Sequence, residues 1–239
     1  MKVTVLSGAG ISTESGIPDY RGPSGLWRRD PDHEKLVTYD YYMGDPEIRR
    51  RSWLFRRDNP AWKAEPNAGH RALAELAAAG MDVWIVTQNV DGLHQRAGSP
   101  PDRVLELHGN MFGAVCTACA ARSTTREAID RVLAGDGDPA CLSCGGILKT
   151  ATVMFGQALD SGVLGRAVEA AGDCDLFVAV GTSLQVQPAA SLVRIAAEGG
   201  ARLIIVNGEP TPYDGLADEV IHEPISEALP RLAARLLLA

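Results

Sequence analysis

The chain has no long hydrophobic run. Its longest uninterrupted apolar stretch is Leu176–Val180, whereas a membrane-spanning helix needs about 20 apolar residues, so we expect no membrane as a partner. The N-terminal stretch Met1–Leu6 carries one basic residue and is too short for a signal peptide, so we interpret it as a first strand. These two features lead us to expect a cytoplasmic protein.

Positive charge is also in short supply. The sequence holds 23 Lys and Arg against 30 Asp and Glu, which gives a formal net charge of −7. Proteins that bind nucleic acids owe much of their affinity to basic side chains that neutralise phosphates. The charge balance therefore argues against a nucleic acid as a partner.

Cysteine is scarce, but its spacing is informative. Four of the five cysteines form two pairs, Cys116-x2-Cys119 and Cys141-x2-Cys144, separated by 21 residues. In a reducing compartment this spacing favours a metal over disulfides, and two such pairs supply the four thiolates of a tetrahedral Zn²⁺ site. Because four protein ligands leave no position for water, we predict a structural zinc. Cys174 lies outside this set and is either a small core residue or a surface thiol.

Strands and helices alternate along most of the chain. Four short apolar runs rich in β-branched residues are typical of strands buried on both faces, namely Val3–Leu6, Val83–Val86, Leu176–Val180 and Leu203–Val206. Helices that end before glycine are predicted between them, over His70–Ala79, Leu164–Ala171 and Ala189–Glu198. The alternation predicts a Rossmann-like, doubly wound α/β parallel sheet with a small zinc-binding domain inserted.

Two stretches break this alternation and set the predicted domain boundaries. The sheet domain is expected over residues 1–16, 67–113 and 149–239. A polar segment rich in Pro, Tyr and Arg, residues 17–66, is interpreted as a loop and helical insertion, and residues 114–148 as the zinc-binding module.

A glycine turn, Gly8-Ala9-Gly10, follows the first predicted strand. Such turns let backbone amides approach a phosphate at a helix N-terminus. The usual GxGxxG pattern is incomplete, since Thr13 stands where its third glycine is expected. Taken alone, the turn fits a phosphate site or a tight turn without a ligand.

The longer string GAGISTESGIPDYRG, residues 8–22, resembles the opening motif of the sirtuins, the NAD-dependent protein deacylases. Further sirtuin-like motifs follow in the family's order: TQNVDGLH at 87–94, LHG at 107–109, the two cysteine pairs, FG at 155–156, GTSL at 181–184 and VNGE at 206–209. The resemblance spans residues 3–230 and implies that the sheet domain binds NAD.

The resemblance also implies roles for individual residues. Histidine can take a proton near neutral pH, and His108 corresponds to the sirtuin general base that assists deprotonation of the ribose hydroxyls. Asn89 is the second residue expected to be catalytic, through ordering of ribose and water, while Asp91 holds the nicotinamide carboxamide and Gln88 contacts the same ribose. Asn89 and Asp91 also fit a turn without a ligand. The other four histidines, His33, His70, His94 and His222, are interpreted as structural.

The full NAD site implied in this way comprises Gly8, Ala9, Gly10, Ser12, Thr13, Ile17, Pro18, Asp19, Tyr20, Arg21, Gln88, Asn89, Asp91, Gly181, Thr182, Ser183, Asn207, Gly208, Glu209 and Ile225.

Sirtuins bind an acyl-lysine protein or peptide as an added strand. The segments expected to pair with it here are Leu184–Pro188 and the four residues Val153, Met154, Phe155 and Gly156. Phe155 fits an acyl-tunnel wall and a core aromatic equally well. Two departures from the family pattern lie nearby, since Lys149–Val153 replaces Arg-Pro-x-x-Val and Gln157 replaces a frequent Glu.

Arg56 has two interpretations. It lies where members that remove acidic acyl groups carry the arginine of a Tyr-x-x-Arg pair, so it could pair with an acyl carboxylate. It could equally belong to a solvated, arginine-rich helix face, and we favour that second interpretation.

The function implied by these motifs is that of an NAD-dependent protein-lysine deacylase releasing nicotinamide and O-acyl-ADP-ribose. The arginine-rich insertion looks more like the sirtuin-4-type class II than the acetyl-specific class, so the acyl group stays open. Two alternatives remain, a protein mono-ADP-ribosyltransferase and a non-catalytic zinc-ribbon binding module. Neither the target protein nor the oligomeric state is indicated.

Overall fold

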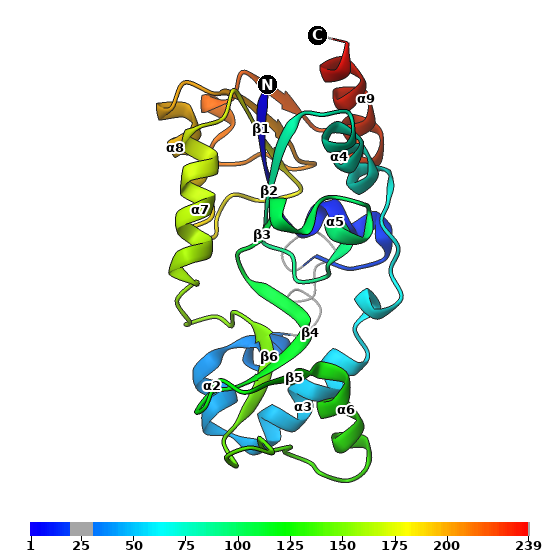
Figure 1. The fold of residues 1–239 in the computed structure, drawn as a ribbon, viewed down its shortest axis with the longest axis vertical. Helices are drawn as coiled ribbons and strands as arrows, with labels where there is room; N and C mark the ends of the chain where they lie inside the picture. Colours follow the sequence, from blue (N-terminus) through cyan, green and yellow to red (C-terminus); the bar gives the residue numbers. More distant parts are fainter. Residues whose placement is uncertain (20–30, 239) are drawn as a thin grey trace. The chain divides into compact units, whose positions relative to one another are not determined.

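The computed structural model describes residues 1–19 and 31–238, which fall into two compact units (Figure 1). The first unit comprises Met1–Asp19, Lys63–Leu107 and Leu159–Ala239, and the second comprises Tyr20–Trp62 and His108–Ala158. Within the described ranges, every helix is too short or too polar to span a membrane.

The first unit is built on a six-stranded sheet in which all neighbouring strands are parallel, in the order β3-β2-β1-β7-β8-β9. The four strands predicted from the sequence form its centre, at β1 (Lys2–Ser7), β2 (Asp82–Thr87), β7 (Leu176–Val180) and β8 (Arg202–Val206). The two edge strands are additions of three residues each, β3 (Val104–Glu106) and β9 (Glu219–Ile221).

Helices cover both faces of this sheet, which confirms the predicted Rossmann-like doubly wound fold (Figure 1). Side chains alternate along a strand, so Val178 of β7 packs in the layer with α4 and α9, whereas Phe177 packs in the layer with α7 and α8. These four helices are α4 (Ala68–Ala78), α9 (Ile225–Leu237), α7 (Ser161–Gly172) and α8 (Ser191–Glu198). Short helical segments complete the unit: η1 (Ala9–Ser15), α5 (Leu93–Arg96), η4 (Pro101–Arg103) and η5 (Asp214–Leu216).

The second unit packs helices against a three-stranded antiparallel sheet of order β5-β4-β6. Its hydrophobic core contains Trp53, Ile129 and Leu148 together with one cysteine of each pair, Cys116 and Cys141. The strands are β4 (Gly109–Cys116), β5 (Arg122–Thr124) and β6 (Leu148–Thr152). The helices are η2 (Pro31–Val37), α2 (Tyr39–Gly44), α3 (Pro46–Arg57), η3 (Pro60–Trp62) and α6 (Thr125–Leu133).

The solvated interpretation of Arg56 is wrong, because its side chain is buried between α3 and β6. Its Nε donates to Thr150 Oγ1 at 2.9 Å and its Nη1 to the carbonyl and hydroxyl of Ser52. Arg49, about two helical turns earlier on the same face, is also buried and forms a bidentate ion pair with Asp138 at 2.8 and 2.7 Å. One face of this arginine-rich helix, with five buried residues of twelve, therefore packs against the rest of its unit.

Asn67 begins α4 and also ties that helix to the segment after β1. Its Oδ1 accepts from Gly69 N at 2.9 Å, which satisfies a helix N-terminal donor. Its Nδ2 donates to the carbonyl of Ile11 at 2.7 Å and to Ser15 Oγ at 3.0 Å. One side chain thus caps a helix and anchors η1.

We expect Asn67→Ala to lower the free energy of unfolding by about 2 kcal/mol, because it removes a helix cap and the bonds to η1 together. Asp160→Ala is the matched control, since Asp160 caps α7 through Val163 N at 2.9 Å with an exposed side chain. That control should cost about 1 kcal/mol. Denaturant unfolding measures both, and equal losses would contradict the anchoring role.

Candidate functional site

The parallel sheet brings most of the predicted NAD residues to one edge of the first unit. The register pairs Ser7 with both Thr87 and Val180, and Val180 with Val206, so β1, β2, β7 and β8 end side by side. Ligands of open α/β sheets bind outside such carboxyl ends. The segments that follow these strands are also bonded to one another, since Gln88 Nε2 donates to Thr182 Oγ1 at 3.0 Å.

Three glycines let two of these segments touch through their backbones. Gly10 N donates to the carbonyl of Gly181 at 2.8 Å. A Cβ on Gly181 would lie 2.3 Å from Ile11 N, and one on Gly8 would lie 2.7 Å from the Gly181 carbonyl oxygen. Gly181 also has a φ of +60°, a region that favours glycine. The packing of these two loops therefore requires the glycine turn.

A cluster of buried polar side chains is hydrogen-bonded to the glycine turn. Asn89 Nδ2 donates to the carbonyl of Gly8 at 3.0 Å and to Ser12 Oγ at 3.2 Å, and Ser12 Oγ donates to Asp91 Oδ2 at 2.8 Å. The other carboxylate oxygen of Asp91 accepts from Leu93 N at 3.0 Å. Burial raises the pKa of the Asp91 carboxyl. The structure thus brings together three predicted site residues, Ser12, Asn89 and Asp91.

Two histidines support this cluster from within the unit, as structural residues. His94 Nε2 lies 2.8 Å from Ser7 Oγ, which donates to Thr87 Oγ1 at 2.9 Å, and His70 Nε2 lies 3.5 Å from Ser12 Oγ. The two imidazole centroids are 5.0 Å apart. Burial lowers the pKa of His70 to about 4 and that of His94 to about 3, so both rings are neutral at neutral pH. Sequence reasoning missed this support, because no spacing relates Ser7 to His94.

Four more of the predicted NAD residues lie after β8 and at the start of α9, namely Asn207, Gly208, Glu209 and Ile225. Asn207 N donates to the carbonyl of Ile221 at 3.0 Å and Asn207 Nδ2 to the carbonyl of Glu209 at 2.7 Å. Ile225 is the first residue of α9 and its side chain belongs to the buried core.

The segment after η1 is described only in part. Ile17 N donates to the carbonyl of Ser12 at 3.2 Å, and residues 17–19 are half-buried. Tyr20 and Arg21, both predicted to contact the cofactor, lie outside the described residues.

His108 belongs to the second unit, at the start of β4. Its carbonyl accepts from Val153 N at 2.8 Å. The next residue, Gly109, has a φ of +71°, and a Cβ there would lie 2.0 Å from the carbonyl oxygen of Ala151. Only glycine fits this close approach, so the glycine of the predicted LHG motif sets the direction in which the backbone leaves His108.

The predicted peptide-binding segment already has a neighbour in its own unit. Phe155 N donates to the carbonyl of Val37, and Tyr39 N to the carbonyl of Phe155, each at 2.9 Å. Met154 N donates to the side chain of Gln157 at 3.0 Å, which gives this departure from the sirtuin pattern a local partner. The side chain of Phe155 is 39% exposed, whereas that of Met154 is buried.

The other departure, the segment Lys149–Val153, begins with a buried lysine, Lys149. Its Nζ donates to the carbonyls of Thr150 at 2.9 Å and Thr152 at 2.6 Å. Burial, together with the nearby Arg56 guanidinium, lowers the pKa of Lys149 to about 8. Both cations therefore have hydrogen-bond acceptors from β6.

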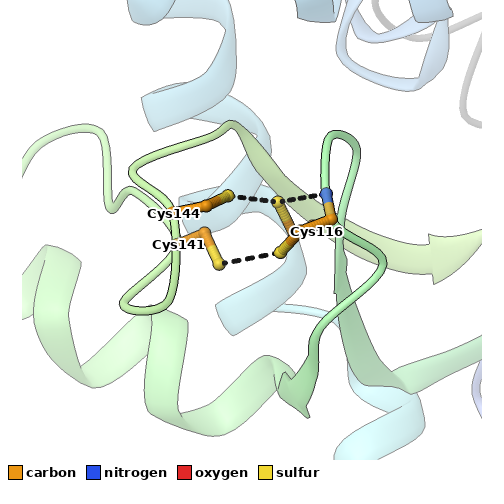
Figure 2. Close-up of side chains that lie close together, drawn as sticks. Cys116, Cys141 and Cys144 are labelled. Carbon is orange, nitrogen blue, oxygen red and sulfur yellow. Dashed lines mark hydrogen bonds between the residues drawn. The ribbon is translucent and has the colours of Figure 1, made fainter.

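The four paired cysteines converge in the second unit. Figure 2 shows Cys116, Cys141 and Cys144 pointing toward one another from two loops. The Cys116–Cys144 and Cys119–Cys141 sulfur distances are 3.5 and 3.7 Å, and all four sulfurs lie within 4.8 Å of one another. Thiolates about 2.3 Å from a tetrahedral Zn²⁺ lie roughly 3.8 Å apart, so the cluster fits zinc.

Backbone N–H groups stabilise the thiolate form of two of these cysteines. The amides of Cys119 and Ala118 lower the pKa of the Cys116 thiol. The amide of Ser143 does the same for Cys141 and lowers its pKa to about 6. Because thiolate is the ligand form, these donors favour metal binding.

The two buried histidines generate a prediction for acid stability. A histidine whose pKa is depressed by folding stabilises the protein fully above about pH 6.5, and this contribution is lost as the pH falls toward the folded value. Between pH 6 and 4, each of His70 and His94 should therefore make the unfolding free energy fall by up to about 1.4 kcal/mol for each pH unit of acidification. Asp91, with its raised pKa, acts in the opposite sense.

Replacing one histidine isolates its share of this slope. His94→Gln should reduce the fall in unfolding free energy between pH 6 and 4 by about 1 kcal/mol per pH unit, whatever it does to stability at pH 7. Urea unfolding at several pH values measures the slope. An unchanged slope would show that His94 protonates in the folded protein.

The cysteine cluster generates a prediction for metal content. Cys141→Ser should lose the one zinc per chain and lower the unfolding temperature, because binding of a structural zinc contributes to folding. Cys174→Ala is the control, a buried cysteine of the first unit that should keep zinc. Elemental analysis and thermal unfolding of both variants test this. Full zinc in Cys141→Ser would refute a four-thiolate site.

Comparison with known proteins agrees with this geometry. The model of the Sir2 family matches residues 8–188. NAD-dependent protein deacetylase 2 of Streptomyces coelicolor is 66% identical over 230 residues, which cover 96% of this chain and 95% of the relative. The NAD-dependent protein deacetylase of Rhodopseudomonas palustris is 43% identical over 229 residues, which cover 95% and 89%.

Solved structures show the same fold. A structure described as Sir2 with a p53 peptide and NAD+ matches with a TM-score of 0.87 at 33% identity and covers 100% of this chain and 94% of that one. Another, described as Sir2 bound to acetylated peptide, matches with a TM-score of 0.86 at 32% identity and the same coverage. The resemblance seen in the sequence motifs is confirmed, and the chain belongs to the Sir2 family.

Proposed function

We propose that this protein is an NAD-dependent protein-lysine deacylase. The products would be nicotinamide, the free lysine and O-acyl-ADP-ribose, with one water consumed. The observation that carries the proposal is the buried cluster of Ser12, Asn89 and Asp91 at the carboxyl edge of the sheet. It is supported by relatives named as NAD-dependent protein deacetylases and by neighbours solved with NAD+ and with acetylated peptide.

The residues at this edge fit a dinucleotide. Asp91 Oδ2 accepts from Ser12 Oγ and Oδ1 from Leu93 N, and a carboxylate offers about four lone-pair sites, so the group keeps acceptor capacity for the amide of a nicotinamide group. Asn89 and Gln88 would contact the adjoining ribose. The adenosine half would be held by Thr182, Ser183, Asn207 and Glu209, where a carboxylate can accept from ribose hydroxyls.

NAD, when bound, supplies the nicotinamide leaving group and the ribose carbon to which the acyl oxygen is transferred. The chain supplies binding and proton transfer. His108 would take a proton from a ribose hydroxyl, since neither Gln88 nor Asn89 has a basic atom. The zinc held by the four cysteines would stabilise the second unit and take no part in the reaction.

The substrate that we propose is a peptide carrying a neutral acyl-lysine such as acetyl-lysine. Arg56, the candidate partner for an acidic acyl group, is buried and donates to Thr150 and Ser52 within its own unit. The peptide would lie along Val153, Met154, Phe155 and Gly156, with Phe155 as a wall for the acyl chain. A cytoplasmic location is part of the proposal, because a reducing compartment keeps free cysteines such as the four paired ones from forming disulfides.

We expect His108→Ala to lower nicotinamide release from NAD and an acetylated peptide by a factor of about 10² to 10⁴, the range for loss of a general base. Zinc content and unfolding temperature should stay near those of the wild type, because His108 is half-buried and its backbone carbonyl makes the bond to Val153. Arg51→Ala, an exposed side chain of the same unit, serves as the activity control.

The assay also distinguishes the alternatives. Nicotinamide release that depends on the acyl-peptide and yields a deacylated product supports the proposal. Incorporation of labelled ADP-ribose into protein without deacylation would indicate a transferase instead. A folded, zinc-loaded wild type that releases no nicotinamide with acetyl, longer neutral or acidic acyl-lysines would overturn the enzymatic function.

A further inference from the structure

His222 immediately follows the edge strand β9, and its ring reaches the turn that follows β8. The register pairs Val206 with Ile221, so the ends of these two strands lie side by side. His222 Nδ1 is 2.7 Å from the backbone carbonyl oxygen of Asn207. A carbonyl oxygen only accepts, so Nδ1 carries a hydrogen and donates to it.

Three hydrogen bonds hold this turn. Besides the bond from His222, Asn207 N donates to the carbonyl of Ile221 at 3.0 Å and Asn207 Nδ2 to the carbonyl of Glu209 at 2.7 Å. The residue between Asn207 and Glu209 is Gly208, and a Cβ there would meet no atom within 4 Å. Glycine in open space has more backbone freedom than any other residue. Side-chain packing therefore does not fix Gly208, and the imidazole adds a third hydrogen bond to the two that already hold the turn.

We infer that His222 is a positioning residue for the adenosine half of NAD, and this inference rests on the proposed function. Acting through Asn207, it presents Asn207 and Glu209 in the arrangement that accepts ribose hydroxyls. Preorganisation of a binding loop lowers the cost of ordering it on binding. Because the adenosine end is remote from the bond that is cleaved, the effect falls on NAD affinity and KM, with kcat at saturation unchanged.

Two substitutions of His222 and one control test this. His222→Ala removes the donor, His222→Asn keeps an N–H donor on a shorter side chain, and Arg194→Ala removes an exposed charge on α8. Calorimetry without peptide measures the dissociation constants of NAD and of ADP-ribose. Nicotinamide release with an acetylated peptide gives KM for NAD and kcat, and thermal unfolding reports on the fold.

His222→Ala should raise the dissociation constants of NAD and ADP-ribose, and KM for NAD, by about three- to tenfold, the equivalent of one hydrogen bond. The value of kcat should stay within about twofold of the wild type, whereas Arg194→Ala should match the wild type throughout. His222→Asn should recover at least half of the lost affinity on a logarithmic scale.

Unchanged dissociation constants in His222→Ala would overturn the inference. A loss of kcat at constant KM in His222→Ala would also overturn it. The same holds if His222→Asn fails to recover affinity and His222→Ala and His222→Asn lose the same thermal stability. If the wild type binds NAD but releases no nicotinamide, the proposed deacylase function fails and the dissociation constants still decide the role of His222. If the wild type binds neither NAD nor ADP-ribose, both conclusions are overturned.

Discussion

The backbone contact between the glycine turn and Gly181 is the constraint on which the candidate site depends. Parallel strands end at one edge of the sheet, but their loops converge only if the chains can approach without side chains between them. The bond from Gly10 N to Gly181 at 2.8 Å holds the turn after β1 against the turn after β7. Asn89, from the turn after β2, donates to the carbonyl of Gly8, so hydrogen bonds link the three loops to one another.

The polar side chains beneath these loops are buried, and burial fixes their orientation and protonation. Asp91 is shielded from water, and its oxygens are aligned by Ser12 Oγ and Leu93 N, so its orientation is set before any ligand arrives. His70 and His94 complete the support as neutral rings, because charging either of them inside the unit would cost more than its hydrogen bonds return. The stability of this unit and the proposed orientation of NAD thus depend on the same side chains.

The second unit is stabilised differently, because its three-stranded sheet covers only a small hydrophobic core. It is tied together by polar and metal-ligating side chains. Arg56 and Lys149 bond to acceptors of β6, and the cysteines gather at the far ends of β4 and β6, where Cys116 is paired with Leu148. Small units of this kind commonly rely on a bound metal for stability. The carbonyl of His108 is bonded to Val153 just after β6, so the same framework holds the proposed base.

The sequence by itself determined the central sheet, the order of the motifs and the metal ligands. Continuous runs rich in β-branched residues are typical of parallel strands covered on both faces, and paired Cys-x2-Cys knuckles have few uses other than metal binding. It did not reveal β3 and β9, because edge strands of three residues carry no continuous apolar run. Only the tertiary structure decided that Arg56 is buried, that Ser7 meets His94 and that His222 reaches Asn207. These contacts join residues 15 to 94 positions apart, and pairing over such distances is set by packing of whole elements, which local patterns do not encode.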